Sequence, residues 1–264
     1  NTRTMPVFRT RADAELTRVI YQRVPVLVNE RTGENPWGVS FLRMFDMSND
    51  SGLFATEPRE GYARLYEGKM IEQYDHRYGN FNGLMCRDNT HLPNLLLEEY
   101  LDPYFLVTPW YWVSRDIVAS IKKKTKIDRK FLCVYRFSTG PTNARTMLSA
   151  IIPDEATNHI LPLFYTSMSV HDCELVSIFN SLVYDYCLRL KMGRQGLDIF
   201  FVKQTPVLPP DFLLAAVIRF VVPRILELTY TAHDLQPFAE DILTEIGVET
   251  WNAWFPHNPI PDSP

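Results

Sequence analysis

The apolar residues in the middle of the chain follow two successive patterns. From Leu175 to Leu190 they recur at spacings of three and four residues, which is the period of one face of an α-helix. Asp172 is placed to cap the start of this stripe and Gly193 to end it, so the pattern predicts a helix of about five turns. The next apolar run, 197–202, is short and is followed by prolines, which predicts a buried strand.

Similar patterns predict the remaining elements. Helices are expected at 12–21, at 114–124 and after Pro210, and strands after Pro25, in 39–47 and in 131–137. Within 131–137, aromatic residues and Cys133 alternate with Leu132, Val134 and Arg136. Because side chains alternate across a strand, Arg136 should face away from the aromatic side.

Together these elements predict an α+β fold. Residues 1–210 are expected to form one domain, in which helices brace a mixed, curled β-sheet, and residues 211–264 a helical C-terminal extension. The predicted strand regions of this sheet lie near Val26, Val39, Met70, Phe131, Met147 and Ile199.

Composition narrows the class of protein. The chain has 264 residues, 46% of them hydrophobic, and no apolar run of about 18 residues, so we expect a globular protein without a membrane partner. Its first residues, Asn1–Thr4, contain neither an initiator methionine nor the core of a signal peptide, which predicts a fragment of a longer cytoplasmic protein. The four cysteines form no CxxC pair, so we expect neither a zinc site nor disulfides.

The charge of the chain is distributed unevenly. The formal net charge is −4, but residues 115–145 contain nine Lys or Arg and two Asp. Residues 211–264 contain eight acidic residues and two basic ones. A basic segment of this kind is typical of proteins that hold nucleic-acid phosphates, and its alternative interpretation is the solvated end of a helix.

A tyrosine-rich stretch, 62–81, concentrates further charged side chains. Lys69, His76 and Arg77 have the donors that phosphates and base edges accept. The alternative is an internally paired polar patch on one face of two strands. For Asn143 and Arg145, beside the turn at 140–141, the alternative is bonding within the loop and to a neighbouring carboxylate.

Six segments of the chain, in order, resemble a known family. They are 8–16 (FRTRADAEL), 65–77 (LYEGKMIEQYDHR), 142–153 (TNARTMLSAIIP), 179–189 (FNSLVYDYCLR), 203–210 (KQTPVLPP) and 226–241 (LELTYTAHDLQPFAED). Together they are similar to the C-terminal half of adenine-specific (N6) DNA methyltransferases of the Eco57I-like and BREX or phage-defence types. The target-recognition region of these enzymes resembles that of the TaqI methyltransferase.

The resemblance implies a division of labour. The missing N-terminal methyltransferase domain of the parent protein would bind S-adenosylmethionine and methylate a flipped adenine, and a nuclease domain could precede it. This chain would recognise double-stranded DNA and hold no cofactor itself, since it lacks a glycine-rich donor loop. The expected DNA-binding residues are Lys69, His76, Arg77, Lys122, Lys123, Lys124, Lys126, Arg129, Lys130, Arg136, Asn143, Arg145, Arg189, Lys191 and Arg194. The lysine-rich group would hold phosphates, whereas Arg136, Asn143, Arg145 and Arg194 would lie nearer the bases or the flanking phosphates.

Two other functions remain open. Glu67 and Lys69 match half of the PD-(D/E)xK nuclease motif, with Asp46 or Asp50 as the upstream metal ligand, which predicts a metal-dependent nuclease. A protein-interaction module would instead use an apolar stripe in the tail. Its members are Ile218, Val221, Val222, Ile225 and Leu228.

Overall fold

The computed structural model of the chain describes residue 6 and residues 8–84, 86–87, 92–213, 215–256 and 264. It shows an α+β fold with helices at the C-terminus, which confirms the predicted fold class. Asn1–Thr4, on which the expectation of a fragment rests, lie outside the described residues. None of the helices in the described ranges combines the length and the apolar character needed to span a membrane.

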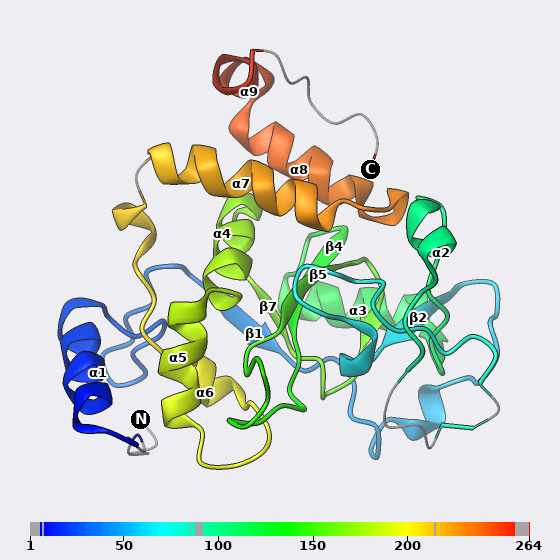
Figure 1. Cartoon of the computed structure of the whole chain (residues 1–264). Coiled ribbons are helices and arrows are strands. Elements are labelled where there is room, and N and C mark those ends of the chain that lie inside the picture. The colour runs from blue at the N-terminus through cyan, green and yellow to red at the C-terminus, as the bar shows by residue number, and fades with distance from the viewer. Residues whose placement is uncertain (1–5, 7, 85, 88–91, 214, 257–263) are drawn as a thin grey trace.

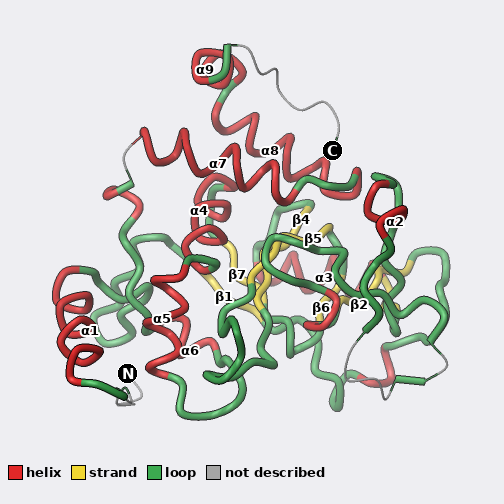
Figure 2. The backbone as a smooth tube through the Cα atoms, in the orientation of Figure 1, coloured by secondary structure: helices red, strands yellow, loops and turns green. Residues whose placement is uncertain are grey.

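Strands lie at the centre of the molecule with helices around them (Figures 1 and 2). The helices are α1 Arg11–Arg23, α2 Leu97–Leu101, α3 Arg115–Thr125, α4 Ser169–Phe179, α5 Leu182–Lys191, α6 Ile199–Lys203, α7 Ala215–Thr229, α8 Gln236–Ile246 and α9 Val248–Trp254. The strands are β1 Ser40–Leu42, β2 Tyr62–Tyr66, β3 Trp112–Ser114, β4 Phe131–Tyr135, β5 Ser149–Pro153, β6 Ala156–Thr157 and β7 Leu163–Tyr165.

The strands form two sheets, where the sequence predicted one. Strands β1, β7, β4 and β5 form, in this order, an antiparallel sheet. Strands β3, β2 and β6 form a second sheet, in which β2 pairs antiparallel with β3 and parallel with β6.

Strand β4 separates two hydrophobic cores. All five of its residues are buried. One face carries Phe131, Cys133 and Tyr135, which pack in the core that contains α4. The other face carries Leu132 and Val134, which pack in the core that contains β2 and β3. Arg136 continues the second face and donates to the carbonyls of Gly68 and Ile71, as the alternation predicted.

The C-terminal helices complete the first of these cores. Helices α7 and α8 lie across the end of α4 (Figure 1), and Val222, Ile225 and Phe238 are buried in the same core as Leu175. Two members of the apolar stripe that an interaction module would use are therefore covered within the chain. Leu228, at its end, is exposed.

The prediction of one continuous helix along the Leu175 to Leu190 stripe is wrong, because the structure has two helices there. Helix α4 ends at Phe179 and α5 begins at Leu182, because Ser181 caps α5 through a hydrogen bond from the Tyr184 N–H. Asn180, at the break, exchanges hydrogen bonds with the backbone of Ser149. The new start turns Leu182 outward, where it is 76% exposed.

Asp172 does not cap this helix either. Helix α4 begins earlier, at Ser169, and Asp172 is buried within its first turn, where it accepts from the Thr166 N–H at 2.7 Å. At the other end of the pair of helices, α5 ends at Lys191, two residues before Gly193, and Arg189 and Lys191 lie in its last turn, where the partly negative carbonyl end favours cations.

The strand predicted at 197–202 is also wrong. The Leu197 N–H donates to the Phe137 carbonyl, but no strand follows, because residues Ile199–Lys203 form α6. A buried apolar run of this length fits either a strand or a short helix, and periodicity cannot distinguish them.

Three other predicted strands are shorter or absent. The chain after Pro25 forms one antiparallel bridge, Val26 with Pro206. The strand expected in 39–47 covers only Ser40–Leu42, and the region of Met70 is a 3-10 turn that follows β2.

Buried charges fasten the C-terminal helices to the second sheet. Asp234, between α7 and α8, accepts from Arg64 of β2 at 3.1 Å and contacts the His76 ring at 3.0 Å. Arg77 is 1% exposed, and its guanidinium donates to the carbonyls of Asp102 at 2.8 Å, Tyr100 at 3.0 Å and Thr231 at 2.8 Å. One side chain thus joins two segments that lie more than a hundred residues apart in sequence.

We expect Arg77→Leu to lower the free energy of unfolding by about 3 kcal/mol or more, because three backbone carbonyls lose a donor that the buried guanidinium supplies. Urea denaturation monitored by tryptophan fluorescence measures this loss. The control is Arg18→Leu on the exposed side of α1, which should change stability by less than about 0.5 kcal/mol. Equal effects of the two variants would contradict a structural role for Arg77.

Candidate nucleic-acid interface

The predicted basic helix is present and gathers its lysines at one end. The helix expected at 114–124 is α3, which runs from Arg115 to Thr125, and Ser114 precedes it at the N-cap position without a side-chain capping hydrogen bond. Lys126 ends the helix in the left-handed conformation, with φ of 59°, and its N–H donates back into the last turn. Lysines are favourable there, because the carbonyl end of a helix is partly negative.

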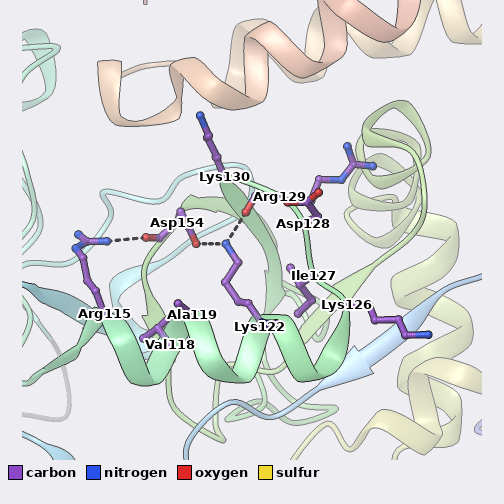
Figure 3. A pocket seen from close by; sticks show the side chains of 11 residues that line it. Arg115, Val118, Ala119, Lys122, Lys126, Ile127, Asp128, Arg129, Lys130 and Asp154 are labelled. Carbon is purple, nitrogen blue, oxygen red and sulfur yellow. Dashed lines mark hydrogen bonds and ion pairs between the residues drawn. The ribbon is translucent and has the colours of Figure 1, made fainter.

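A groove of about 620 Å³ opens beside this helix (Figure 3). Its walls come from α3, from the loop that leads into β4 and from the end of β5. The charged residues that line it are Arg115, Lys122, Lys123, Lys126, Asp128, Arg129, Lys130 and Asp154. Six basic groups against two acidic ones make the lining cationic.

Asp154 organises the inner part of the groove. Its carboxylate accepts from Lys122 Nζ at 2.5 Å, and the same Nζ donates to the Arg129 carbonyl at 2.5 Å. Arg115 donates to the Asp154 carbonyl at 3.2 Å, as the dashed lines in Figure 3 show. Arg115 and Asp154 were not among the expected DNA-binding residues. Arg115 belongs to the basic segment, whereas nothing in the sequence indicated that Asp154 would face Lys122.

The other lysines of this segment point away from carboxylates. Lys123, Lys124, Lys126 and Lys130 are exposed, and within the described ranges none of them has an ion-pair partner. In Figure 3, Lys126 and Lys130 extend away from the ribbon. These four ammonium groups are therefore available to an anionic ligand. We call them the groove lysines, although only Lys123, Lys126 and Lys130 line the groove and Lys124 lies next to it in sequence.

Arg129, in contrast, contacts polar side chains of both α4 and α8. Its guanidinium donates to Ser169 Oγ at the start of α4, and lies 3.3 Å from both Asp241 and Glu245 of α8. It also lies 3.9 Å from Asp172, and burial raises the pKa of that carboxyl to about 7. Arg129 joins the groove to the C-terminal helices, so we assign it to structure and not to DNA.

The tyrosine-rich segment buries two of its three expected DNA-binding residues, His76 and Arg77. His76 is 0% exposed and contacts Asp234. Arg77 is 1% exposed, and its guanidinium donates to backbone carbonyls. Lys69 Nζ lies 4.8 Å from the centroid of the Phe81 ring. The alternative of an internally paired polar patch describes this segment better than contacts to phosphates.

Arg136 is also occupied internally. It donates to the carbonyls of Gly68 and Ile71 and lies 3.8 Å from Glu72, and burial lowers its pKa. A guanidinium with these partners has few donors left for a base.

The remaining expected residues gather around the β4–β5 connection and the end of α5. Arg145 donates to the Asn180 carbonyl, and Arg189 to the carbonyls of Pro141 and Ala144. Arg145 thus bonds a backbone carbonyl, where the alternative interpretation expected a carboxylate.

Lys191 and Arg194 have partners near α6. Lys191 donates to the Gln204 carbonyl at 2.6 Å, and burial lowers its pKa to about 8. Arg194 pairs with Asp198 but stays 60% exposed. Asn143 is exposed and donates to Thr139 Oγ1 at 3.3 Å, a bond within its own loop.

The groove and the residues expected to read bases lie at opposite ends of the β4–β5 hairpin. The groove adjoins the Phe131 and Pro153 end of the β4–β5 hairpin, and Asn143 and Arg145 lie beyond the Tyr135 and Ser149 end. The four residue steps between these ends span about 13 Å. The expected phosphate-binding and base-reading residues therefore do not line one cleft.

The residues of the nuclease alternative serve other contacts. Glu67 is buried, and its carboxylate pairs with Arg87 at 2.9 Å. Asp46 bonds the N–H groups of Ser48 and Asn49 in its own turn. In the described part of the chain, no group of three or more His, Cys, Asp or Glu side chains is arranged to hold a metal ion.

The fold and the groove define an α+β protein with a cationic surface site. No protein-family model matches the chain, and no curated protein is similar to it. The chemistry of the groove thus carries the functional interpretation.

We expect Arg129→Gln to lower the free energy of unfolding by about 2 kcal/mol, because Asp172 loses its cationic neighbour and Ser169 its donor. Chemical denaturation at pH 7 measures this. The matched control is Lys130→Gln, the next residue along the chain, which should stay within about 0.5 kcal/mol of the parent protein. If the two variants unfold alike, Arg129 is not a structural residue.

Proposed function

We propose that this chain binds double-stranded DNA through the groove lysines, as the target-recognition part of an adenine-N6 DNA methyltransferase in a bacterial restriction-modification or phage-defence system. The six ordered segments that resemble this family support the proposal, under which the parent protein acts on DNA in the cytoplasm. Methyl transfer from S-adenosylmethionine would belong to the catalytic domain of the parent protein, and this chain would contribute binding.

The observation that carries the proposal is the contrast between the groove and the rest of the chain. The net charge is −4, yet Lys123, Lys124, Lys126 and Lys130, in the last turn of α3 and the loop that leads to β4, have no ion-pair partners among the described residues. Neighbouring ammonium groups without ion-pair partners repel each other, so these lysines do not stabilise the fold. A bound polyanion neutralises the lysines, so their mutual repulsion falls and each ammonium group attracts a phosphate. This is the basis of phosphate binding by lysine clusters.

The groove favours the DNA backbone over a base edge. Lysine ammonium groups are flexible point charges that neutralise phosphates without requiring one geometry, whereas base recognition uses the planar donors of Arg, Asn or Gln. Of the residues expected nearer the bases, Asn143 and Arg194 have exposed side chains that carry such donors. Sequence recognition would therefore come from the far end of the β4–β5 hairpin, with the groove as the anchor.

Binding to random-sequence duplex DNA should weaken steeply with salt. Each phosphate contact contributes about −0.9 to the slope of log K against log salt concentration, so four groove lysines predict a slope of about −3.6. Replacement of Lys123, Lys126 and Lys130 together by Glu should flatten the slope by about 2.7 or abolish binding. Fluorescence anisotropy across a salt series measures both values.

The control for this variant carries the same change in net charge elsewhere. Arg18, Arg31 and Arg59 are exposed and lie outside the groove, so their joint replacement by Glu tests long-range attraction alone. The control should keep most of the slope. If both triple variants lose affinity equally, or if the parent protein does not bind DNA at low salt, the groove is not the binding site.

Asp154→Asn should act in the opposite direction. The substitution removes the carboxylate that lies 2.5 Å from Lys122 Nζ, so that this ammonium group can meet a fifth phosphate. The slope should become steeper by about 0.9, and affinity at low salt should rise. The same anisotropy titration tests this, and unchanged binding would place the DNA away from Lys122.

A further inference from the structure

A second cavity lies on another side of the molecule and is apolar. It has a volume of about 440 Å³ and is enclosed by α1, α4, α5, the segment 206–208 and α7. Ile20, Val24, Ile178, Val207, Val217 and Val221 form much of its wall. In Figure 1, α1 and α5 lie side by side, and the segment before α7 runs from beside them up to α7, which crosses α4. A cavity of this size and character is typical of small-molecule sites.

One ionisable group interrupts the apolar wall. Glu174 lines the cavity from α4, on the same helical face as Ser177 and Ile178. Its residue surface is only 4% exposed, and no donor in the described residues bonds its carboxyl group. Its carboxyl oxygens are not fully covered by protein atoms, so a ligand in the cavity can reach them.

The elements around Glu174 supply no neutralising charge. The segments from α1, α7 and 206–208 present apolar side chains, and the titratable neighbours that line the cavity are the Tyr184 hydroxyl and the Cys187 thiol, both on α5. Burial raises the pKa of Glu174 to about 7 and that of Cys187 to about 11. Among the described residues that line the cavity, Glu174 thus supplies the one carboxyl group, its pKa lies near 7, and no Lys, Arg or His accompanies it.

We propose that this cavity binds a small aliphatic amine, with its ammonium group against the Glu174 carboxylate and its hydrocarbon part between α1, α4 and α7. A cation is the partner that a desolvated, unpaired carboxylate lacks, since it restores both the charge balance and the hydrogen bonds. The apolar wall excludes a strongly hydrated ligand such as a bare metal ion or an amino acid. This proposal is independent of DNA binding, which uses another surface.

The test uses two probes that differ in one group, n-octylamine and octan-1-ol. Isothermal titration calorimetry on the whole chain at pH 8 should show that the amine binds at least tenfold more tightly than the alcohol. Glu174→Gln should weaken the amine at least tenfold and leave the alcohol within about threefold, because it keeps the shape and removes the charge. The control variant is Glu227→Gln, which removes an exposed carboxylate of α7 and should change neither affinity.

Proton linkage provides a second readout. Because burial raises the pKa of Glu174 to about 7, the carboxyl is mostly protonated at pH 5.5 and must lose a proton to pair with the amine. Affinity for n-octylamine should therefore fall at least tenfold from pH 8 to pH 5.5 in the parent protein and stay level in Glu174→Gln. Without ligand, Glu174→Gln should raise the thermal midpoint at pH 8 and leave it nearly unchanged at pH 4, since the parent protein loses stability as pH rises from about 4.5 through 7.

Three results would overturn the proposal. Equal binding of both probes, with no effect of Glu174→Gln, would make the cavity a non-selective apolar site. No binding of either probe would mean that it holds no small molecule. A dimer in light scattering that Glu174→Gln dissociates would assign the cavity to a second copy of the chain.

Discussion

The β4–β5 hairpin is buried on both faces, and the rest of the chain is arranged to cover it. A strand that faces water on one side needs a single apolar layer, but Phe131–Tyr135 and Ser149–Pro153 are buried throughout. The aromatic face of β4 is covered by α4 and by α7 and α8 behind it, and the aliphatic face by β2, β3 and α3. The C-terminal helices are therefore part of the core that the hairpin requires.

Two covering layers on opposite faces must also be joined at their edges, and polar contacts do this. Asp234 reaches from the α7–α8 connection to Arg64 and His76 of the other layer, and Arg77 binds carbonyls from both sides. Glu245 of α8 accepts from the N–H groups of Ser169 and Val170 and so caps α4 from outside. Each contact satisfies a group that burial would otherwise leave unpaired.

The sequence predicted the elements that depend on local signals. Alternation along Phe131 to Arg136 identified β4 and the direction of Arg136, and a lysine-rich end marked α3. The break at Asn180 was missed because the 3.6-residue period continues through it, while the signal for a new helix was Ser181 alone. Pairing across long separations was beyond sequence patterns, so the burial of His76 and Arg77 and the contact of Asp154 with Lys122 could not be foreseen.

These pairings change how the net charge of the chain should be understood. The acidic tail includes Asp234, Asp241 and Glu245, and all three lie against cationic groups of the preceding residues. Their charge neutralises structural Arg64 and Arg129 and does not extend as a negative surface over the groove. Among the basic groups that have no carboxylate partner in the described residues are the groove lysines, which lie in the last turn of α3 and in the loop that follows it. A net negative protein can thus present a cationic site, because internal ion pairs use its carboxylates and leave its lysines exposed.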